Sequence, residues 1–248
     1  MLSNDIRKIV LQLVYESQSG HIGGSFSVAD TIAGIFNSYD VPYGDKLILS
    51  KGHAVPALYA ALYLKGILKD EDLKGFRKVG NSKTRLQGHP DKVLLPEVTA
   101  TTGSLGQGLS IAIGHALMTT NKVFCIIGDG ELQEGQNWEA LMFAGNKKLK
   151  NLICVLDNNG AQNDGYTDSI MSLGDIEAKV RSFGWTPITV DSHDDMTNFF
   201  RSLVNELKPT FVIVNSTKGK GVSFMENPVW HSKAPNTEEY NKALEELA

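Results

Sequence analysis

The stretch KVFCIIGDGELQEG, residues 122–135, joins a run of apolar residues to two glycines that flank Asp129. The apolar run predicts a buried strand, and the glycines predict a turn that opens a helix. Such a turn can seat a phosphate, because glycine lets the backbone approach and the helix start offers unpaired N–H groups. A bare carboxylate would repel this ligand, so Asp129 favours a metal-bound diphosphate or triphosphate, with magnesium as the bridging ion. The alternative for this tripeptide alone is a tight turn with a helix-capping aspartate.

Apolar runs rich in valine and isoleucine alternate with helical patterns along the rest of the chain. The segments expected to be strands are 46–50, 122–127, 151–157, 186–190 and 209–216. The segments expected to be helical include 28–37, 104–118, 133–149, 175–183 and 194–207. Alternation of this kind implies a parallel sheet that helices cover on both faces. We therefore predict one α/β domain over residues 1–248, with a doubly wound parallel sheet of about five strands.

The loops that follow the predicted strands carry most of the polar residues of interest. In sheets of this class, ligands bind beyond the carboxyl ends of the strands. The loops SKGH, GDG, DNN and STKGKG each follow one predicted strand. Asn159, in DNNGAQNDG, is therefore expected near Asp129 as a further oxygen ligand. The lysines of TKGKG, residues 217–221, are interpreted as part of a solvated loop rather than as a phosphate-binding patch.

The composition is that of an ordinary globular protein. The 248 residues are 42% hydrophobic and 21% charged, with a formal net charge of −4, so a nucleic-acid partner is disfavoured. The N-terminal segment mixes acidic with apolar residues and predicts neither a signal peptide nor a membrane span, which favours a cytoplasmic location. Cys125 and Cys154 lie in apolar runs and are expected to be buried, reduced thiols.

The chain contains six histidines, and four of them lie in loops that also contain glycine or proline. These are His21, His53, His89 and His231. Small neighbours leave room for a ligand, and loops carry many functional sites, although they also form ordinary surface. The other two, His115 and His193, are interpreted as surface or capping residues.

Several motifs, taken in order, resemble those of transketolase, a thiamine diphosphate enzyme. They are SGHIGGSFS, LSKGHAVPALYAAL, LQGHPD, TTGSLGQGLS, GDGELQEGQNWEA, LDNNGAQNDG and KGKGVSFMENPVWHSKAPN. The usual nucleotide motifs do not fit, because a dinucleotide-binding turn would need glycine at Gln133 and no phosphate-loop motif occurs. The resemblance runs from about Ser19 to the C-terminus. It implies the thiamine diphosphate-binding fold, in the half that holds the diphosphate.

The resemblance implies ligands for a metal and for thiamine diphosphate. Asp129, Asn159 and the backbone carbonyl of Ala161 would hold Mg²⁺, with Ca²⁺ or Mn²⁺ as alternatives. The residues expected to bind the cofactor are His53, Gly103, Leu105, Gly128, Gly130, Glu131, Asn159 and His231. Among these, Gly130 and Glu131 would offer backbone N–H groups to the diphosphate, whereas Gly103 and Leu105 would line its aminopyrimidine side.

The chemistry of this family suggests a role for the loop histidines in proton transfer. Thiamine diphosphate attacks a ketose carbonyl, splits the sugar and stabilises a two-carbon carbanion. Each half-reaction moves a proton on or off a sugar hydroxyl near neutral pH, where imidazole is well matched. The resemblance therefore implies that His21, His89 and His231 are catalytic residues that reach a small sugar substrate.

The resemblance also implies a partner. Full-length transketolases have a second domain that binds the pyrimidine ring and supplies the glutamate that activates it. The chain matches only the first domain, so it is expected to be the N-terminal subunit of a split transketolase. It would require a separate C-terminal subunit for activity, and the family suggests a dimer of heterodimers.

Three residues depart from the transketolase pattern. Asn163 stands where the family usually has an apolar residue near the thiazolium, and Ser232 replaces the usual glycine. Ser104 stands where full-length enzymes usually have proline, and split forms resemble this chain there. The first two departures leave the substrate open, between a specialised sugar phosphate and a sulfosugar.

Other functions compete with transketolase on the sequence alone. Two are enzymatic, a deoxyxylulose-phosphate synthase and the α-subunit of a 2-oxo-acid dehydrogenase, and LSKGHAVPALYAAL and LQGHPD disfavour both. A third is a regulatory or scaffold subunit that has lost catalysis. The intact set of His21, His53, His89, Asp129 and Asn159 argues against such a loss.

Overall fold

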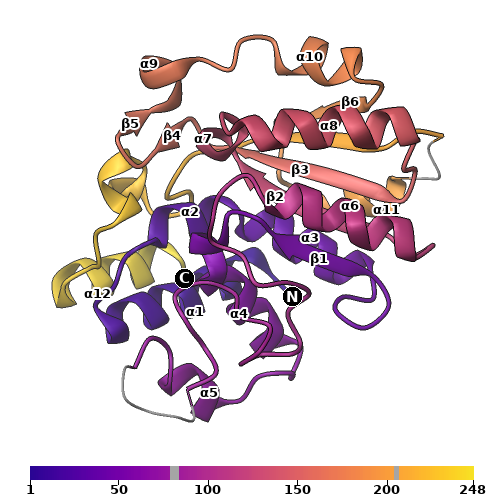
Figure 1. Ribbon diagram of the computed structural model, residues 1–248. Coiled ribbons are helices and arrows are strands. Elements are labelled where there is room, and N and C mark those ends of the chain that lie inside the picture. Colours follow the sequence, from indigo (N-terminus) through magenta and orange to yellow (C-terminus); the bar gives the residue numbers. More distant parts are fainter. Residues whose placement is uncertain (79–83, 204–206) are drawn as a thin grey trace.

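A five-stranded parallel sheet forms the centre of the molecule in the computed structural model, which describes residues 1–78, 84–203 and 207–248 (Figure 1). The strand order is β1-β2-β3-β7-β6. The strands are β1 (Lys46–Leu49), β2 (Val123–Gly128), β3 (Leu152–Asn158), β6 (Thr186–Val190) and β7 (Thr210–Asn215). The predicted fold class and all five predicted strands are therefore confirmed.

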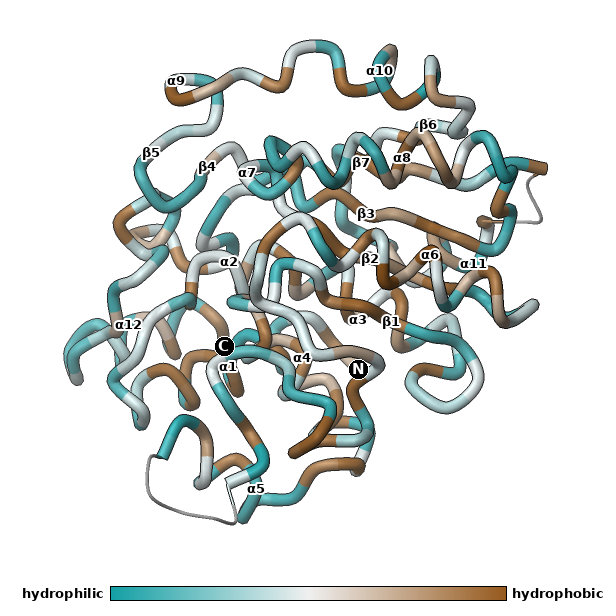
Figure 2. The backbone as a smooth tube through the Cα atoms, viewed as in Figure 1, coloured by the Kyte–Doolittle hydropathy of each residue, from teal (hydrophilic) through white to brown (hydrophobic). Residues whose placement is uncertain are grey.

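The two central strands are apolar on both sides, which explains why their sequences do not alternate with polar residues. In β2, Phe124 and Ile126 enter one hydrophobic cluster, whereas Val123, Cys125 and Ile127 enter another. In Figure 2, β2 and β3 are largely brown, the colour of hydrophobic residues. The sheet therefore separates two cores, and each core needs its own cover of helices.

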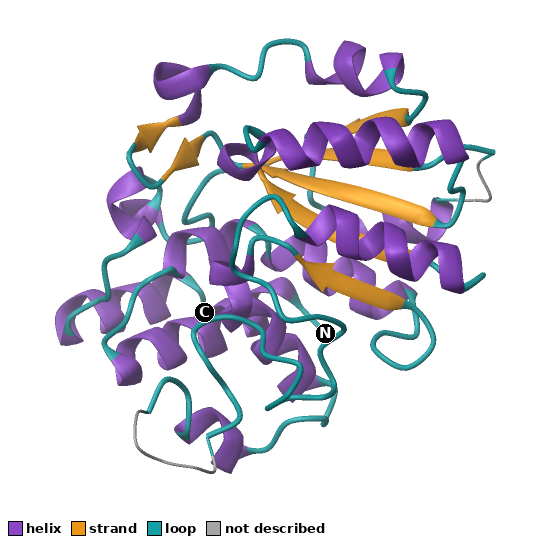
Figure 3. Ribbon diagram, viewed as in Figure 1, coloured by secondary structure: helices purple, strands orange, loops and turns teal. Residues whose placement is uncertain are grey.

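Helices provide that cover on both faces (Figure 3). The face with Phe124 packs against helices that include α1 (Ser3–Ser17), α3 (Ala29–Ser38), α4 (Val55–Leu64) and α11 (Met196–Ser202). The opposite face packs against α6 (Gly108–Met118), α8 (Gly135–Lys147) and α10 (Ile176–Ser182). The C-terminal α12 (Thr237–Glu246) lies against α1, where the rings of Tyr15 and Tyr240 stack.

The remaining elements are short and lie mainly around the carboxyl ends of the strands. They are α2 (Ile22–Ser27), α5 (Asp70–Lys74), α7 (Asp129–Leu132), α9 (Thr167–Met171), β4 (Ala161–Gln162), β5 (Gly165–Tyr166) and the 3₁₀ turns η1 (Gly52–Ala54), η2 (Ser223–Met225) and η3 (Pro228–His231). The described residues from 84 to 107 contain no helix or strand. This long loop crosses the region where ligands of such sheets bind.

The structure differs from the sequence prediction in three elements. The helix expected over 104–118 begins only at Gly108, as α6, and residues 104–107 belong to the preceding loop. The helix expected over 194–207 is confirmed only as α11, and part of that range lies outside the described residues. The antiparallel hairpin β4–β5 was not predicted, because strands of two residues leave no periodic signal. Both cysteines are free and buried, as expected. Among the described residues, no helix has the length and apolar character needed to cross a bilayer.

Candidate active site

A cavity of about 440 Å³ opens where β1, β2, β3 and β7 end. Its walls come from the loops that follow these strands, together with the β4–β5 hairpin. Predicted site residues that line it are His53, Leu105, Gly128, Asp129, Gly130, Glu131, Asn159, Ala161 and His231. Distant parts of the sequence therefore meet at one edge of the sheet, as the parallel topology requires.

Asp129 supplies a buried negative charge to this cavity. Its carboxylate accepts hydrogen bonds from the Gly130 backbone N–H (2.8 Å) and from Thr167 Oγ1 (3.0 Å). The residue is 3% exposed, and within the described ranges no cationic side chain forms an ion pair with it. Burial, and then the charge of Asp157, raise the pKa of this carboxyl. A bound cation would relieve both effects.

Asn159 presents its amide oxygen to the same region because its amide nitrogen is already engaged. Nδ2 donates to Asp157 Oδ2 (2.9 Å) and to Ser27 Oγ (3.2 Å). Since a carboxylate only accepts, this pairing fixes the orientation of the amide. Oδ1 accepts from the Ala161 backbone N–H at 3.1 Å and retains a further lone pair.

A buried ion pair between Lys51 and Asp157 lies beneath these oxygen atoms. Asp157 also accepts hydrogen bonds from Ser27 and Ser216. Burial alone would raise the pKa of Asp157, but the charge and hydrogen bonds around it, led by Lys51, outweigh burial and lower it. Asp157 therefore stays ionised and holds the Asn159 amide in place.

Glu131 connects three loops of the cavity wall through its buried side chain. The carboxylate accepts from Ser50 Oγ, from the Gly106 backbone N–H (3.0 Å) and from the Gly128 backbone N–H (3.2 Å). Burial raises the pKa of this carboxyl, whereas these hydrogen bonds oppose that rise. The sequence resemblance implied only a backbone role for Glu131, so its side-chain role is an addition from the structure.

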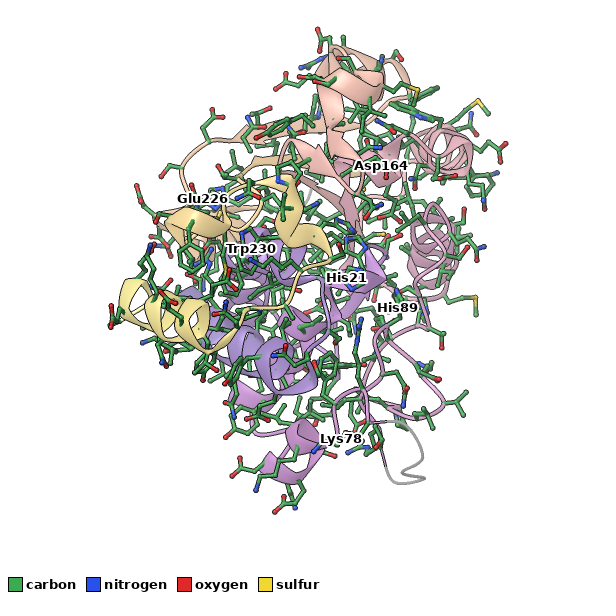
Figure 4. The ribbon with its side chains drawn as sticks, turned by 90° about the vertical axis from the view of Figure 1, so that its left-hand side faces the viewer. His21, Lys78, His89, Asp164, Glu226 and Trp230 are labelled. Carbon is green, nitrogen blue, oxygen red and sulfur yellow. The ribbon has the colours of Figure 1, made fainter. Side chains whose placement is uncertain are left out.

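The four loop histidines form one cluster. The ring centroid of His21 lies 5.5 Å from that of His53, 5.3 Å from that of His231 and 6.4 Å from that of His89. Figure 4 shows His21 and His89 on neighbouring loops. Burial, and after it the charges of nearby cations, lowers the pKa of His21 to about 4 and that of His231 to about 3. These imidazoles are neutral at pH 7.

Two of these histidines and Gly103 stand outside the walls of the cavity itself. His21 and His89 continue the cluster from His53 and His231 but do not line the cavity. Gly103 lies against His89, with φ of +139°, and a Cβ there would be 2.9 Å from His89 Cδ2. Leu105, two residues later, does line the cavity. The loop from Gly103 to Leu105 thus connects the cavity with the outer histidine.

The interpretation of TKGKG as a solvated loop is wrong for Lys218. This residue is 3% exposed, and its Nζ donates to the Ala161 carbonyl and to His231 Nδ1, both at 2.8 Å. Burial, followed by the charge of Lys51, lowers the pKa of Lys218 to about 8. A short lysine-rich loop gives no local signal of burial, because the partners that bury it come from other strand ends.

The interpretation of His193 as a surface or capping residue is also wrong. Its side chain is 6% exposed and lies 2.8 Å from Asp30 Oδ2 and 2.9 Å from the Asn215 carbonyl. Asp30 also pairs with Arg7 (2.8 Å) and Lys220 (3.0 Å). His193 is therefore part of a structural charge network away from the cavity.

Three side chains of the site were missed because their partners are distant in sequence. Lys51 and Asp157 occur in the quoted loops SKGH and DNN, so their position after a strand was the available signal. Arg77 contacts His21, and no sequence pattern marked it. Of the residues that depart from the family pattern, Asn163 lines the cavity, whereas Ser104 and Ser232 are exposed.

The comparisons with known proteins point to one family. The family model of the transketolase thiamine diphosphate-binding domain matches residues 1–246. A 6-deoxy-6-sulfo-D-fructose transketolase subunit from Clostridium sp. (strain MSTE9) is 40% identical, over 97% of this chain and 92% of its own length. An apulose-4-phosphate transketolase subunit from Phocaeicola vulgatus is 34% identical, over 98% of this chain and 91% of its own.

Solved structures give the same result for the fold. A transketolase from Leishmania mexicana superposes with a TM-score of 0.91 at 27% identity, and a transketolase mutant from Pichia stipitis with 0.89 at 30%. Each comparison covers 99% of this chain but 40% of the solved one. The chain therefore belongs to the family of transketolase thiamine diphosphate-binding domains.

Proposed function

We propose that this chain is the thiamine diphosphate- and metal-binding subunit of a two-subunit transketolase, which transfers a two-carbon ketol unit from a ketose to an aldose. The observation that carries the proposal is the convergence of Asp129, Asn159 and the Ala161 carbonyl at one cavity. Lys218 and the histidine cluster lie beside them. The relatives named as transketolase subunits support the same activity.

The metal ligands that we propose are Asp129 Oδ, Asn159 Oδ1 and the Ala161 carbonyl. These oxygens suit a hard divalent cation, Mg²⁺ first and Ca²⁺ or Mn²⁺ as alternatives. The Ala161 carbonyl accepts one hydrogen bond from Lys218, and a carbonyl oxygen has a second lone pair for a metal. Within the described residues, no group of three or more His, Cys, Asp or Glu side chains is arranged to hold a metal. The set that we propose instead combines one carboxylate with an amide oxygen and a backbone carbonyl.

The diphosphate-binding groups that we propose are cationic or backbone donors. The ammonium of Lys218 and the backbone N–H groups of Gly130 and Glu131 would contact phosphate oxygens, with His53 and His231 beside them. Gly130 has no room for a side chain, since a Cβ there would lie 2.8 Å from Gln162 Cβ. Gly128 would border the same group, and Gly103 and Leu105 would lie along the aminopyrimidine.

The proposed chemistry assigns the histidines to the sugar. When bound, thiamine diphosphate accepts the electron pair released as the carbon–carbon bond of the ketose breaks. His21, His89 and His231 would orient the sugar hydroxyls and move protons at their oxygens. Because the low pKa values of His21 and His231 keep both rings neutral at pH 7, each carries one N–H donor for a developing alkoxide.

The proposal also covers the domain organisation, the partner subunit and the cellular location. We propose that residues 1–248 form one domain, which the two cores on opposite faces of one sheet support. Relatives that match over nearly their whole length are named as subunits, which supports a separate C-terminal subunit. We propose a dimer of such heterodimers. We also propose a cytoplasmic location, which the two free cysteines favour.

The proposed donor is a ketose that carries an anionic group. By their names, two relatives use a sulfosugar and a sugar phosphate, which share a terminal anion. A phosphate or a sulfonate is therefore the class of substrate to test first, in sugar metabolism of the pentose phosphate type. Asn163, exposed at the cavity, is the residue of this chain that we expect to influence that choice.

Native mass spectrometry of the tagged chain isolated from its source cells tests the proposed function. We expect two copies of this chain with two of a second chain, together with thiamine diphosphate and a divalent metal. The isolated complex should use a ketose phosphate or sulfosugar as donor and should not use pyruvate. A chain free of partner and cofactor, or a complex that consumes pyruvate, would contradict the proposal and favour a scaffold or another thiamine enzyme.

Replacement of Lys218 tests the diphosphate site. In the complex, Lys218→Met should raise the dissociation constant of thiamine diphosphate about tenfold or more, because a charge-assisted hydrogen bond contributes about 1.5–3 kcal/mol. Isothermal titration calorimetry measures this change. The matched control is Lys220→Met in the same loop, whose ammonium faces Asp30 instead. Equal affinities of the two variants for thiamine diphosphate would show that Lys218 does not bind the diphosphate.

A further inference from the structure

Arg77 reaches into the histidine cluster from the loop that follows α5. Its Nη2 lies 3.2 Å from His21 Nδ1 and 3.3 Å from the Gly88 carbonyl. Its backbone N–H donates to the Leu86 carbonyl at 3.0 Å. The residue has a φ of +54°, an unfavourable conformation for arginine that the surrounding contacts must stabilise.

Gly88 leaves the space that the guanidinium occupies. A Cβ at this position would lie 2.7 Å from both Arg77 Nε and Arg77 Nη2. Any side chain there would therefore displace the guanidinium from His21. Arg77 has a strained backbone, and Gly88, which lies next to it in space, has no side chain. Together they place the Arg77 guanidinium beside the His21 imidazole.

The contact between Arg77 and His21 determines the tautomer of the histidine. A guanidinium has five N–H donors and no acceptor, so the Nδ1 atom that it contacts must be the unprotonated, accepting nitrogen. The proton of the neutral ring is then on Nε2. The His21 backbone is also held, because its N–H donates to the His231 carbonyl at 2.8 Å.

We propose that Arg77 is a positioning residue that keeps His21 neutral in the Nε2–H tautomer, so that His21 acts as a hydrogen-bond donor to a sugar oxygen. The part of this inference that concerns the sugar oxygen rests on the proposed function. The part that concerns the tautomer of His21 does not. Its consequence is that His21 can donate a hydrogen bond or its Nε2 proton to a developing alkoxide, but cannot act as the base that removes a proton from the sugar.

The surroundings of His21 support a neutral ring. Burial lowers its pKa most, followed by the charges of Arg77, His89 and Lys218. The rings of His53 and His231 also face it, and the described residues place no carboxylate in ion-pair contact with it. The described groups around His21 therefore favour the neutral form over the imidazolium.

Nitrogen NMR of the histidine-labelled chain tests the tautomer directly, with His21→Gln to assign the signal. In the wild-type chain we expect Nε2 to be protonated and Nδ1 to be bare at every pH above about 5. In Arg77→Met, both tautomers should appear, and the protonation midpoint should rise by about one pH unit, because a nearby like charge has been removed. A protonated Nδ1 in the wild-type chain, or no change in Arg77→Met, would overturn the proposal.

The pH profile of the assembled complex separates positioning from packing. In Arg77→Met, the acidic limb of kcat/KM should move to higher pH by about one unit. A packing role would lower the rate equally at every pH. Lys78→Met is the control, since Lys78 is exposed and lies away from His21 in Figure 4. Because the NMR measurement needs neither partner nor cofactor, a complex without transketolase activity would refute only the proposed function.

Discussion

Asp129→Asn is expected to lower the transketolase activity of the assembled complex by about 100-fold or more. Changes to groups that merely support a metal ligand cost about 10–100-fold, and Asp129 is the proposed ligand that carries the charge. The amide keeps the size of the side chain and its contact with Thr167, so the loss would reflect charge rather than shape. Initial rates with a saturating ketose donor, over a range of Mg²⁺ concentrations, measure the effect.

The same substitution should stabilise the chain in the absence of metal. Burial raises the pKa of Asp129, so its ionised form opposes folding at pH values above that pKa. Removal of the charge should therefore raise the midpoint of thermal unfolding at pH 7 while activity is lost. Asp164→Asn is the matched control, because Asp164 is exposed on the adjacent hairpin and bonds only to Asn163 in the described structure. Full activity of Asp129→Asn would exclude a metal role and would support a regulatory subunit.

Lys51→Met is expected to lower the free energy of unfolding by about 3–5 kcal/mol, the cost of leaving one partner of a buried ion pair alone. The uncompensated charge would be that of Asp157, which is 2% exposed at the end of β3. Urea denaturation at pH 7 measures the change. A loss below about 1 kcal/mol would show that the pair contributes no more than a surface salt bridge.

A second substitution tests whether charge causes that loss. Asp157→Asn, added to Lys51→Met, removes the unpaired carboxylate and still accepts hydrogen bonds from Ser27. We expect the double variant to regain part of the stability lost in the single one, with a coupling energy above about 1 kcal/mol. Lys65→Met, at the exposed end of α4, controls for the loss of a lysine and should stay within about 0.5 kcal/mol of the wild type.

The elements that were predicted correctly have local causes. The strands β2 and β3 are unbroken apolar runs, and such runs between helical patterns require a parallel sheet with two covered faces. Because parallel strands end at the same edge, the order of loops along the chain was enough to bring GDG and DNN together. The gathering of His21, His53, His89 and His231 was expected from family motifs, and the structure confirms that they lie together.

The sequence did not predict which side chains pair with one another. Lys51 and Asp157 are separated by 106 positions, and His21 and Arg77 by 56, so no spacing rule relates them. Lys218 stands in a loop of glycines and lysines that is typical of solvated surface, and only packing against β4 and η3 buries it. The sequence by itself determined the sheet, the edge at which the cavity lies and the family, because apolar runs, glycine turns and motif order are local properties. The tertiary structure decided which charges are paired, which nitrogen of His21 carries its proton and which lysines are buried, because these depend on distances between distant segments.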